Sequence, residues 1–232
     1  MEGRTHVVTE QSKQRITRLI DDVTEECSRF SCVVSGGRRS ILCIYSFFME
    51  LDYQAALRQV LDREAIRDCL YRYCRGIDRA DEALLRSVYW PDAHDCHGAY
   101  DGDVDGFLAQ ALPRLRSGGR GVHQISNILI ELHGERAAVE SSFLALQTTA
   151  AAPAHETFLA GRYLDRFEKR SGEWRIADRT VVYDWIEERE RRELAQDDAT
   201  LFAKRRPNGG RLQSDPVYAF LAQVRGGGPA KG

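Results

Sequence analysis

The feature that most constrains the fold of this chain is a helical apolar pattern in residues 61–81. Apolar side chains recur there every three or four residues, a spacing that gathers them along one stripe of an α-helix. The members of the stripe are Leu61, Ile66, Leu70, Tyr73, Cys74 and Ile77. Since a stripe of this kind is stable only when another element covers it, the pattern predicts a buried helix over residues 50–78.

A second short helix is predicted over residues 81–89, with Asp81 as its N-cap. Asp78 therefore stands at the junction of two helices. A carboxylate at a helix C-terminus meets the negative end of the helix dipole, which is unfavourable unless a cation or a hydrogen-bond donor compensates it. We therefore expect a partner for the Asp78 carboxylate.

Residues 104–115 form a further amphipathic helix, and beyond residue 120 the apolar period changes to strict alternation. In the first alternating segment His123, Ile125, Asn127 and Leu129 share one face. Residues 90–102 predict only half a strand and a glycine-marked turn. Four full strands are predicted over residues 122–132, 136–148, 157–169 and 173–185. Helices followed by consecutive strands predict the α+β class with an antiparallel sheet.

The two ends of the chain differ from this middle part. Residues 1–48 keep no single apolar period, which predicts a weakly ordered N-terminal extension. Met49 directly precedes the first regular segment, so we hypothesise that the native protein starts there; a genuine N-terminal arm is the alternative. Residues 49–190 are expected to form the domain. Residues 191–232 are expected to form a tail with a short docking helix over residues 216–224, and the charged run 187–193 is interpreted as a solvated helix end.

Several short motifs between residues 57 and 185 share an order and spacing with a known family. They are Tyr73, Ile77-Asp78, His123, Gly161-Arg162-Tyr163, Trp174-Arg175-Ile176, Arg179 and Asp184-Trp185. Together they resemble the SnoaL-like branch of the nuclear transport factor 2-like (NTF2-like) superfamily, which contains scytalone-dehydratase-like, bile-acid-dehydratase-like and dehydrochlorinase-like enzymes. The resemblance implies an NTF2-like cone, in which N-terminal helices pack inside a strongly curved antiparallel sheet around one apolar pocket.

Asp78 and His123 are the pair that we expect to carry catalysis. An imidazole whose far nitrogen is held by a buried carboxylate is fixed in one tautomer and becomes a better base. In the enzymes that this chain resembles, a histidine and an aspartate at these two places remove a proton from the substrate. The residues alone are equally compatible with a structural histidine at the start of a strand, so that alternative stays open.

Tyr73 and Arg179 complete the expected catalytic set. The resemblance implies that Tyr73 protonates or orients a leaving group, with core packing as the alternative. Arg179 projects from an otherwise apolar strand face, so it needs either a substrate oxyanion or an internal carboxylate as its partner. Asn127 and Tyr183 are expected to line the pocket and bind substrate.

The resemblance implies a cofactor-independent lyase or isomerase of the dehydratase type. In it, the His-Asp dyad would abstract a proton from a bulky apolar ring compound, such as a steroid-like or polyketide-like molecule. The alternative is a non-catalytic ligand-binding or assembly module that resembles the small subunit of ring-hydroxylating dioxygenases. Because one face of such a sheet is exposed, we expect a homo-dimer or homo-trimer.

Composition argues against several other classes. A net charge of −2 with dispersed Lys and Arg predicts no nucleic-acid partner. The longest apolar run, residues 41–48, is far shorter than the ~20 residues that span a bilayer, and six cysteines without paired spacing fit a cytoplasmic protein.

One short segment contains several residues of the types that bind metals: His94, Asp95, Cys96 and His97. Strand alternation would turn His97 away from His94 and Cys96. We therefore expect no metal and no other cofactor.

Overall fold

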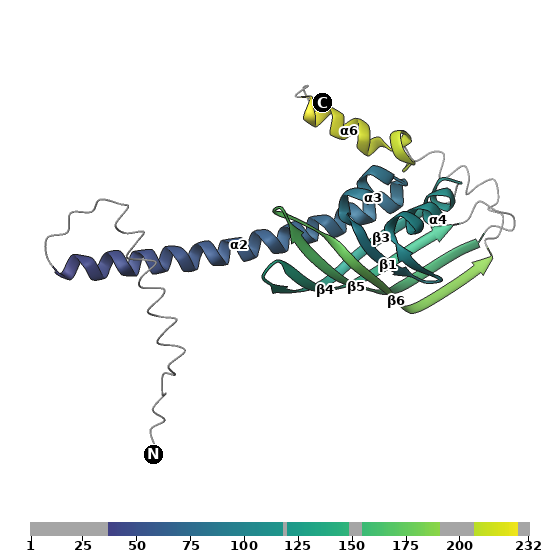
Figure 1. Ribbon diagram of the computed structural model, residues 1–232. Helices are drawn as coiled ribbons and strands as arrows, with labels where there is room; N and C mark the ends of the chain where they lie inside the picture. Colours follow the sequence, from purple (N-terminus) through teal and green to yellow (C-terminus); the bar gives the residue numbers. More distant parts are fainter. Residues whose placement is uncertain (1–36, 118–119, 149–154, 191–206, 227–232) are drawn as a thin grey trace, which may run out of the picture. The chain divides into compact units, whose positions relative to one another are not determined.

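The structure is a computed structural model that describes residues 37–117, 120–148, 155–190 and 207–226 (Figure 1). The chain divides into two compact units, Met1–Ala56 and Leu57–Gly232. Helix α2 spans Gly37–Arg79 and contributes to both units. All other described elements belong to the second unit.

Helix α2 begins at Gly37, well before the predicted residue 50. The chain contains neither glycine nor proline between Gly37 and Gly76, so no helix-breaking residue interrupts it. Residues 37–48 of the predicted N-terminal extension are thus part of this helix. Residues 1–36 and 191–206 lie outside the described residues, and the Met49 start stays a hypothesis.

The predicted junction between two helices is confirmed. Helix α2 ends just before Ala80, whose φ of 53° is left-handed, and the N–H of Asp81 donates to the carbonyl of Gly76 at 2.9 Å. Asp81 then caps α3 (Glu82–Val88) by accepting a hydrogen bond from the N–H of Leu84 at 3.0 Å. Asp78 accordingly occupies the last turn of α2.

The apolar stripe of α2 forms the centre of the core. Ile66, Leu70 and Tyr73 are at most 1% exposed, although Leu61, the first member of the predicted stripe, is 58% exposed. Helix α4 (Val104–Arg116) confirms the predicted amphipathic segment. Its buried face consists of Val104, Phe107, Leu108, Ala111 and Leu112.

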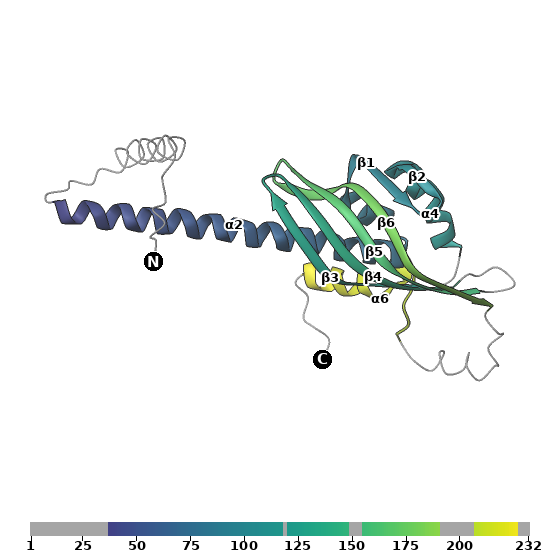
Figure 2. The ribbon, with the colours of Figure 1, turned by 90° about the horizontal axis from the view of Figure 1, so that it is seen from below.

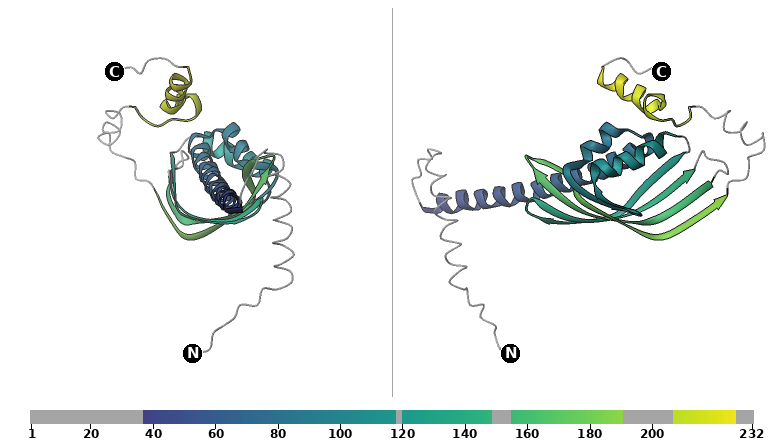
Figure 3. Two further views of the ribbon diagram at one scale, coloured as in Figure 1. Left: turned by 90° about the vertical axis from the view of Figure 1, so that its left-hand side faces the viewer. Right: turned by 45° about the vertical axis from the view of Figure 1, so that its right-hand side comes forward.

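The sheet has six strands in the order β2-β1-β6-β5-β4-β3 (Figure 2). Their bounds are β1 Tyr89–His97, β2 Tyr100–Asp103, β3 Gly121–His133, β4 Arg136–Thr148, β5 His155–Arg170 and β6 Glu173–Glu190. Figure 3 shows that the sheet is strongly curved and that helices α3 and α4 lie on its concave side. Buried residues of α2 pack into the same core, so the α+β class and the curved sheet around the helices are confirmed.

One strand pairing differs from the predicted antiparallel sheet. Strand β1 runs parallel to β6, while all other neighbouring strands are antiparallel. Residues 90–102, predicted to hold half a strand, lie in a complete β1–β2 hairpin. Alternating polarity identifies a strand but not its partner, and β1 meets β6 only after a long connection.

Strand β6 also runs further than predicted. The charged residues 187–190, interpreted from the sequence as a helix end, pair with residues 155–158 of β5. Their side chains are exposed on both sides of the strand. A segment without an apolar face shows no period, and its structure is set by backbone pairing with the neighbouring strand.

Strand β3 contains a β-bulge at Asn127, whose φ is 46°. Asn127 and Ile128 together oppose Ser141, so the side chains beyond the bulge change faces. The inward face passes from His123 to Ile128 and Ile130, and Asn127 is exposed. The prediction that Asn127 shares the face of His123 is therefore wrong.

Gly161 on β5 is a position where no side chain fits. A Cβ atom there would lie 2.0 Å from the carbonyl oxygen of Val182 and 3.0 Å from the ring of Phe143. We expect Gly161→Ala to lower the free energy of unfolding by about 1–3 kcal/mol, because backbone and ring must both move. Urea denaturation followed by circular dichroism measures the change.

Gly134→Ala is the matched control, because a Cβ atom at this turn glycine meets nothing within 4 Å. Its φ of +63° predicts a smaller loss of roughly 1 kcal/mol. Equal losses in the two variants would show that the close approach at Gly161 is not the cause.

The described part of the C-terminal segment is largely helical. A short turn of 3-10 helix, η1 (Leu212–Ser214), leads into α6 (Pro216–Arg225), which covers the expected docking helix over residues 216–224. None of the helices in the described ranges is both long and apolar enough to cross a membrane.

Candidate functional site

The structure brings the two expected dyad residues into direct contact. Nδ1 of His123 lies 2.7 Å from Oδ1 of Asp78, and the backbone N–H of His123 donates to Oδ2 of Asp78 at 3.1 Å. One residue of β3 therefore occupies both oxygens of the carboxylate. The expected partner of Asp78 is thus His123, and the two donors compensate the carboxylate at the end of α2.

The contacts of the His123 ring define its working nitrogen. A carboxylate can only accept, so Nδ1 carries the proton that it donates to Asp78. The side-chain nitrogen of Gln147 lies 3.3 Å from Nε2, in the place of a donor to an unprotonated nitrogen. Nε2 is therefore the atom at which His123 can accept a proton.

Burial and backbone contacts hold this pair in place. The side chains of His123 and Asp78 are 7% and 11% exposed. The carbonyl oxygen of Asp78 accepts from Nη1 of Arg79 at 3.4 Å and from Nη1 of Arg211, which lies just before η1. The last turn of α2, which carries the Asp78 side chain, is thus secured by cations that also compensate the helix dipole.

Gln147 is a site residue that sequence reasoning missed. It lies near the end of β4, on the same alternating face as the buried Phe143 and Ala145. A polar residue at an inward position of a strand was the available signal, because it needs a partner inside the protein. Ala145, not Gln147, is directly opposite His123, so the contact with His123 is diagonal.

Tyr73 and Arg179 lie in a separate buried cluster. Arg179 donates to both oxygens of Asp165 at 2.7 Å, and both side chains are completely buried. The guanidinium lies between the rings of Tyr73 and Tyr163, 4.1 Å and 4.2 Å from their centroids. Of the two partners that the sequence left open for Arg179, the structure shows the internal carboxylate.

The charges of this cluster follow from burial and pairing. Burial alone lowers the pKa of Arg179, but the Asp165 carboxylate outweighs this effect and holds that pKa well above its ordinary value. Burial raises the pKa of Tyr73, so its hydroxyl stays protonated. The cluster therefore holds one ion pair and a neutral phenol in the core.

Tyr183 lies on the inner face of the sheet, as expected. Its half-buried ring is edge-on to Phe143, with the centroids 6.2 Å apart, and the register of the strands places Ile125, Phe143, Gly161 and Tyr183 in one row. The ring of Phe143 covers Gly161. This row is apolar and lies beside His123; Phe143 is buried in it, Ile125 and Tyr183 are partly exposed, and Asn127 lies outside it.

Comparison with known proteins identifies the family. The pattern of the SnoaL-like domain matches residues 58–180, more than half of the chain. The chain belongs to the SnoaL-like domain family. Its fold is accordingly NTF2-like, and no curated protein matches the sequence.

Solved structures share the fold of this SnoaL-like domain. A hexachlorocyclohexane dehydrochlorinase (LinA type 2) is similar with a TM-score of 0.55 and 21% identity, over 60% of this chain and 97% of the other. A putative scytalone dehydratase from Novosphingobium aromaticivorans is similar with a TM-score of 0.51 and 18% identity, over 59% and 92% of the two chains. At these identities the likeness shows the fold alone.

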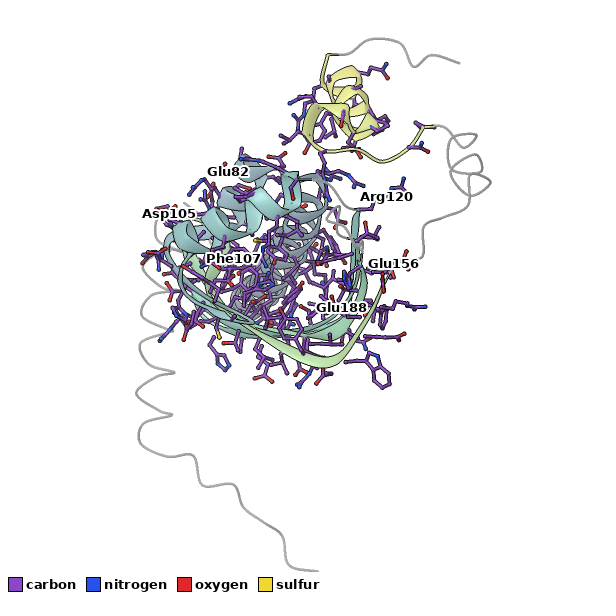
Figure 4. The ribbon with its side chains drawn as sticks, turned by 90° about the vertical axis from the view of Figure 1, so that its right-hand side faces the viewer. Glu82, Asp105, Phe107, Arg120, Glu156 and Glu188 are labelled. Atoms are coloured by element: carbon purple, nitrogen blue, oxygen red, sulfur yellow. The ribbon has the colours of Figure 1, made fainter. Side chains whose placement is uncertain are left out.

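The histidines of β1 are separated, as the alternation predicted. Exposed His94 pairs with Asp101 at 2.7 Å, whereas the ring of His97 stacks on Phe107 with centroids 4.9 Å apart. Figure 4 shows Phe107 projecting from α4 into the space between this helix and the sheet. In the part of the SnoaL-like domain that the structure describes, His, Cys, Asp and Glu form no group of three that could hold a metal ion.

The C-terminal segment, which lies beyond the residues that match the SnoaL-like domain, docks beside the dyad. Asp215, which is 5% exposed, accepts from the N–H groups of Gly210 and Val217 at 2.8 Å and 3.0 Å and pairs with Arg79 at 2.9 Å. The hydroxyl of Tyr218 donates to Asp81 at 2.6 Å. These contacts hold α6 against the junction of α2 and α3.

We expect Asp215→Asn to loosen this segment. Burial alone raises the pKa of Asp215, but the two N–H donors and the nearby arginines outweigh it and lower the pKa below 3.8. A lowered pKa means that the ionised form stabilises docking above about pH 4 and that this stabilisation is lost as the pH falls through the lower folded value. Hydrogen exchange of the α6 amides measures both effects, and the variant should open more easily by about 1–3 kcal/mol.

Asp184→Asn provides the control, because Asp184 is exposed and pairs with Arg162 away from α6. Its α6 amides should exchange at the wild-type rate. Unchanged protection in Asp215→Asn, at neutral and at acid pH, would contradict the docking role of Asp215.

Proposed function

We propose that this SnoaL-like protein is a cofactor-independent lyase or isomerase that acts on a bulky apolar ring compound. The observation that carries the proposal is the contact between Asp78 and His123, which leaves Nε2 of a buried imidazole as a proton acceptor. The carboxylate fixes the tautomer and balances the charge of the ring once it has taken a proton.

The surroundings of the dyad fit an apolar ring substrate. In the row of Ile125, Phe143, Gly161 and Tyr183, the partly exposed side chains of Ile125 and Tyr183 offer apolar contacts to a ring system. His123 stands two residues before Ile125 on the same strand face. A ring that rests on this row would present a C–H bond to Nε2.

The proposed step is proton abstraction from a carbon next to a carbonyl or leaving group. His123 takes the proton at Nε2, and the electron pair of the C–H bond forms a double bond. In a dehydratase the bond to the leaving oxygen breaks; in an isomerase the proton returns to another carbon. Steroid-like and polyketide-like ring ketones have the acidic C–H bond that either reaction needs.

Tyr73 and Arg179 act in this proposal through positioning and charge. Arg179 is neutralised by Asp165 and contacts the rings of Tyr73 and Tyr163, so the ion pair fixes these two phenol rings in the core. The ring of Tyr163 stacks on that of Phe143 with the centroids 4.5 Å apart. Tyr163 therefore holds Phe143, a member of the apolar row, in a fixed orientation.

A substrate screen in D2O tests the proposed function. Bicyclic ring ketones that carry a hydroxyl, acetate or chloride on the carbon β to the carbonyl are incubated with the protein, and mass spectrometry follows deuterium uptake and elimination. We expect deuterium uptake or elimination with at least one ring class. Binding of these ketones without either reaction would overturn the enzyme proposal and favour a ligand-binding module.

Exposed apolar side chains on the outer face of the sheet support self-association. They also favour the second candidate function, an assembly module. The exposed apolar side chains on this face alternate along the strands with buried ones. The exposed ones are Leu129, Leu144, Leu146 and Leu164. Four exposed leucines on adjacent strands mark a contact surface. We propose a homo-dimer or homo-trimer through this face, which light scattering of the purified protein measures; a complex with a larger oxygenase-type subunit is the second candidate.

A further inference from the structure

Strand β1 carries a second aspartate and histidine on the inner face, apart from the dyad described above. Asp95 is completely buried, and its Oδ2 accepts from the hydroxyl of Tyr89 at 2.6 Å. Burial raises the pKa of Tyr89 well above its ordinary value, so Tyr89 remains a donor. One oxygen of Asp95 is therefore satisfied by a phenol from the start of the same strand.

The other oxygen of Asp95 faces His97. Nδ1 of His97 lies 3.4 Å from Oδ1 of Asp95, and within the described ranges neither of these two buried atoms makes a hydrogen bond. A buried carboxylate oxygen without a donor is costly, so a ring N–H at this place is what the carboxylate requires. His97 is accordingly expected to hold its proton on Nδ1, as His123 does.

The remaining edge of the His97 ring is open. The side chain is 25% exposed although Nδ1 is buried, whereas the His123 side chain is 7% exposed. Phe107 fixes the plane of the ring by stacking on it. Nε2 thus lies on the accessible edge of the ring and has no protein partner among the described residues. Asp95 and Phe107 contact the other parts of the ring.

His97 also belongs to the same inner surface as the first dyad. Its ring is edge-on to Tyr183, with the centroids 6.5 Å apart, and Tyr183 contacts Phe143 in the row next to His123. Ring contacts therefore run from His97 on β1 through Tyr183 to Phe143 on β4, the strand that pairs with the strand of His123. A ring compound lying on this row would have one histidine on each side.

We propose that His97, positioned by Asp95 and Tyr89, is a second catalytic acid–base residue of the proposed reaction. The inference rests on the proposed function. It identifies His97 as the source of the proton that the leaving group needs during elimination. His123 takes the proton from carbon, the electron pair forms the double bond, and the bond from carbon to the leaving hydroxyl breaks. In its doubly protonated form, His97 donates the proton on Nε2 to this hydroxyl, which departs as water and leaves His97 with the Nδ1 proton alone. Exchange with solvent then restores the protonation of both rings.

The leaving group provides a kinetic test of this assignment. A hydroxyl needs a proton to depart, whereas acetate does not, so His97→Gln should slow loss of hydroxyl from a screened substrate at least tenfold more than loss of acetate. His94→Gln is the matched control, because exposed His94 lies on the same strand and pairs with Asp101. Equal slowing for both leaving groups would reduce His97 to a structural residue.

Nitrogen NMR of 15N-histidine-labelled protein tests the site without a turned-over substrate, using 1-naphthol as a hydroxylated two-ring probe. We expect the His97 signals to report a proton on Nδ1, to lose this preference in Asp95→Asn, and to shift together with those of His123 when 1-naphthol is added. A proton on Nε2 while Nδ1 carries none, or a response of His123 alone, would overturn the inference and leave the proposed function standing. No response of either histidine would count against both.

Discussion

His123→Ala is expected to lower kcat on an active ring substrate by about 10²–10⁴-fold, the contribution of a positioned general base. The variant removes Nε2, the only atom of the Asp78–His123 pair placed to accept a proton. Deuterium exchange at the substrate carbon should fall by the same factor, because abstraction is the step that is lost. Steady-state kinetics and exchange followed by mass spectrometry measure the two rates.

His133→Ala is the matched control for this variant. His133 ends the same strand, and its side chain is 71% exposed beside Glu131. Its kcat should equal that of the wild type, and circular dichroism should show the same fold for both variants. A His123→Ala protein that turns over substrate at the wild-type rate would exclude the dyad as the base.

Arg179→Met is expected to cause the largest loss of stability in the domain, about 3–5 kcal/mol. The substitution keeps most of the side-chain volume but leaves the fully buried Asp165 carboxylate without its cation. It also removes the guanidinium from between Tyr73 and Tyr163. Urea denaturation measures the free energy of unfolding.

Two further variants separate the buried charge from other causes. Adding Asp165→Leu to Arg179→Met removes the orphaned carboxylate and should restore most of the loss, since a buried ion pair can be replaced by apolar residues at little cost. Arg162→Met breaks an exposed pair with Asp184 and should cost no more than about 1 kcal/mol. A double variant as unstable as Arg179→Met alone would contradict the explanation.

The helices and the two dyad residues were predictable from the sequence because their signals are local. The stripe of α2, the cap at Asp81 and the unfavourable place of Asp78 each depend on a few neighbouring residues. The position of Asp78 at a helix end predicted a need for a partner, and the resemblance to the family pointed to His123 at the start of a strand. Their contact follows once the fold family is recognised.

The partners across the sheet were less predictable, because β-bulges shift the register. Counting outward from the turn at Ser171 would place Leu164 opposite Arg179. A register shift between Arg166 and Phe167 brings Asp165 there instead, which gives the arginine its carboxylate. Neither this bulge nor the one at Asn127 is marked by glycine or proline, so pattern alone could not reveal them.

The parallel pairing of β1 with β6 affects how the protein emerges from the ribosome. Helices α2–α4 and β1 are synthesised first, yet the edge of β1 stays without its neighbour until β6 has been made. At ribosomal speed this interval is on the order of ten seconds, during which apolar helix faces and an open strand edge are available to chaperones. The nascent chain can complete its core only after β6 has been synthesised.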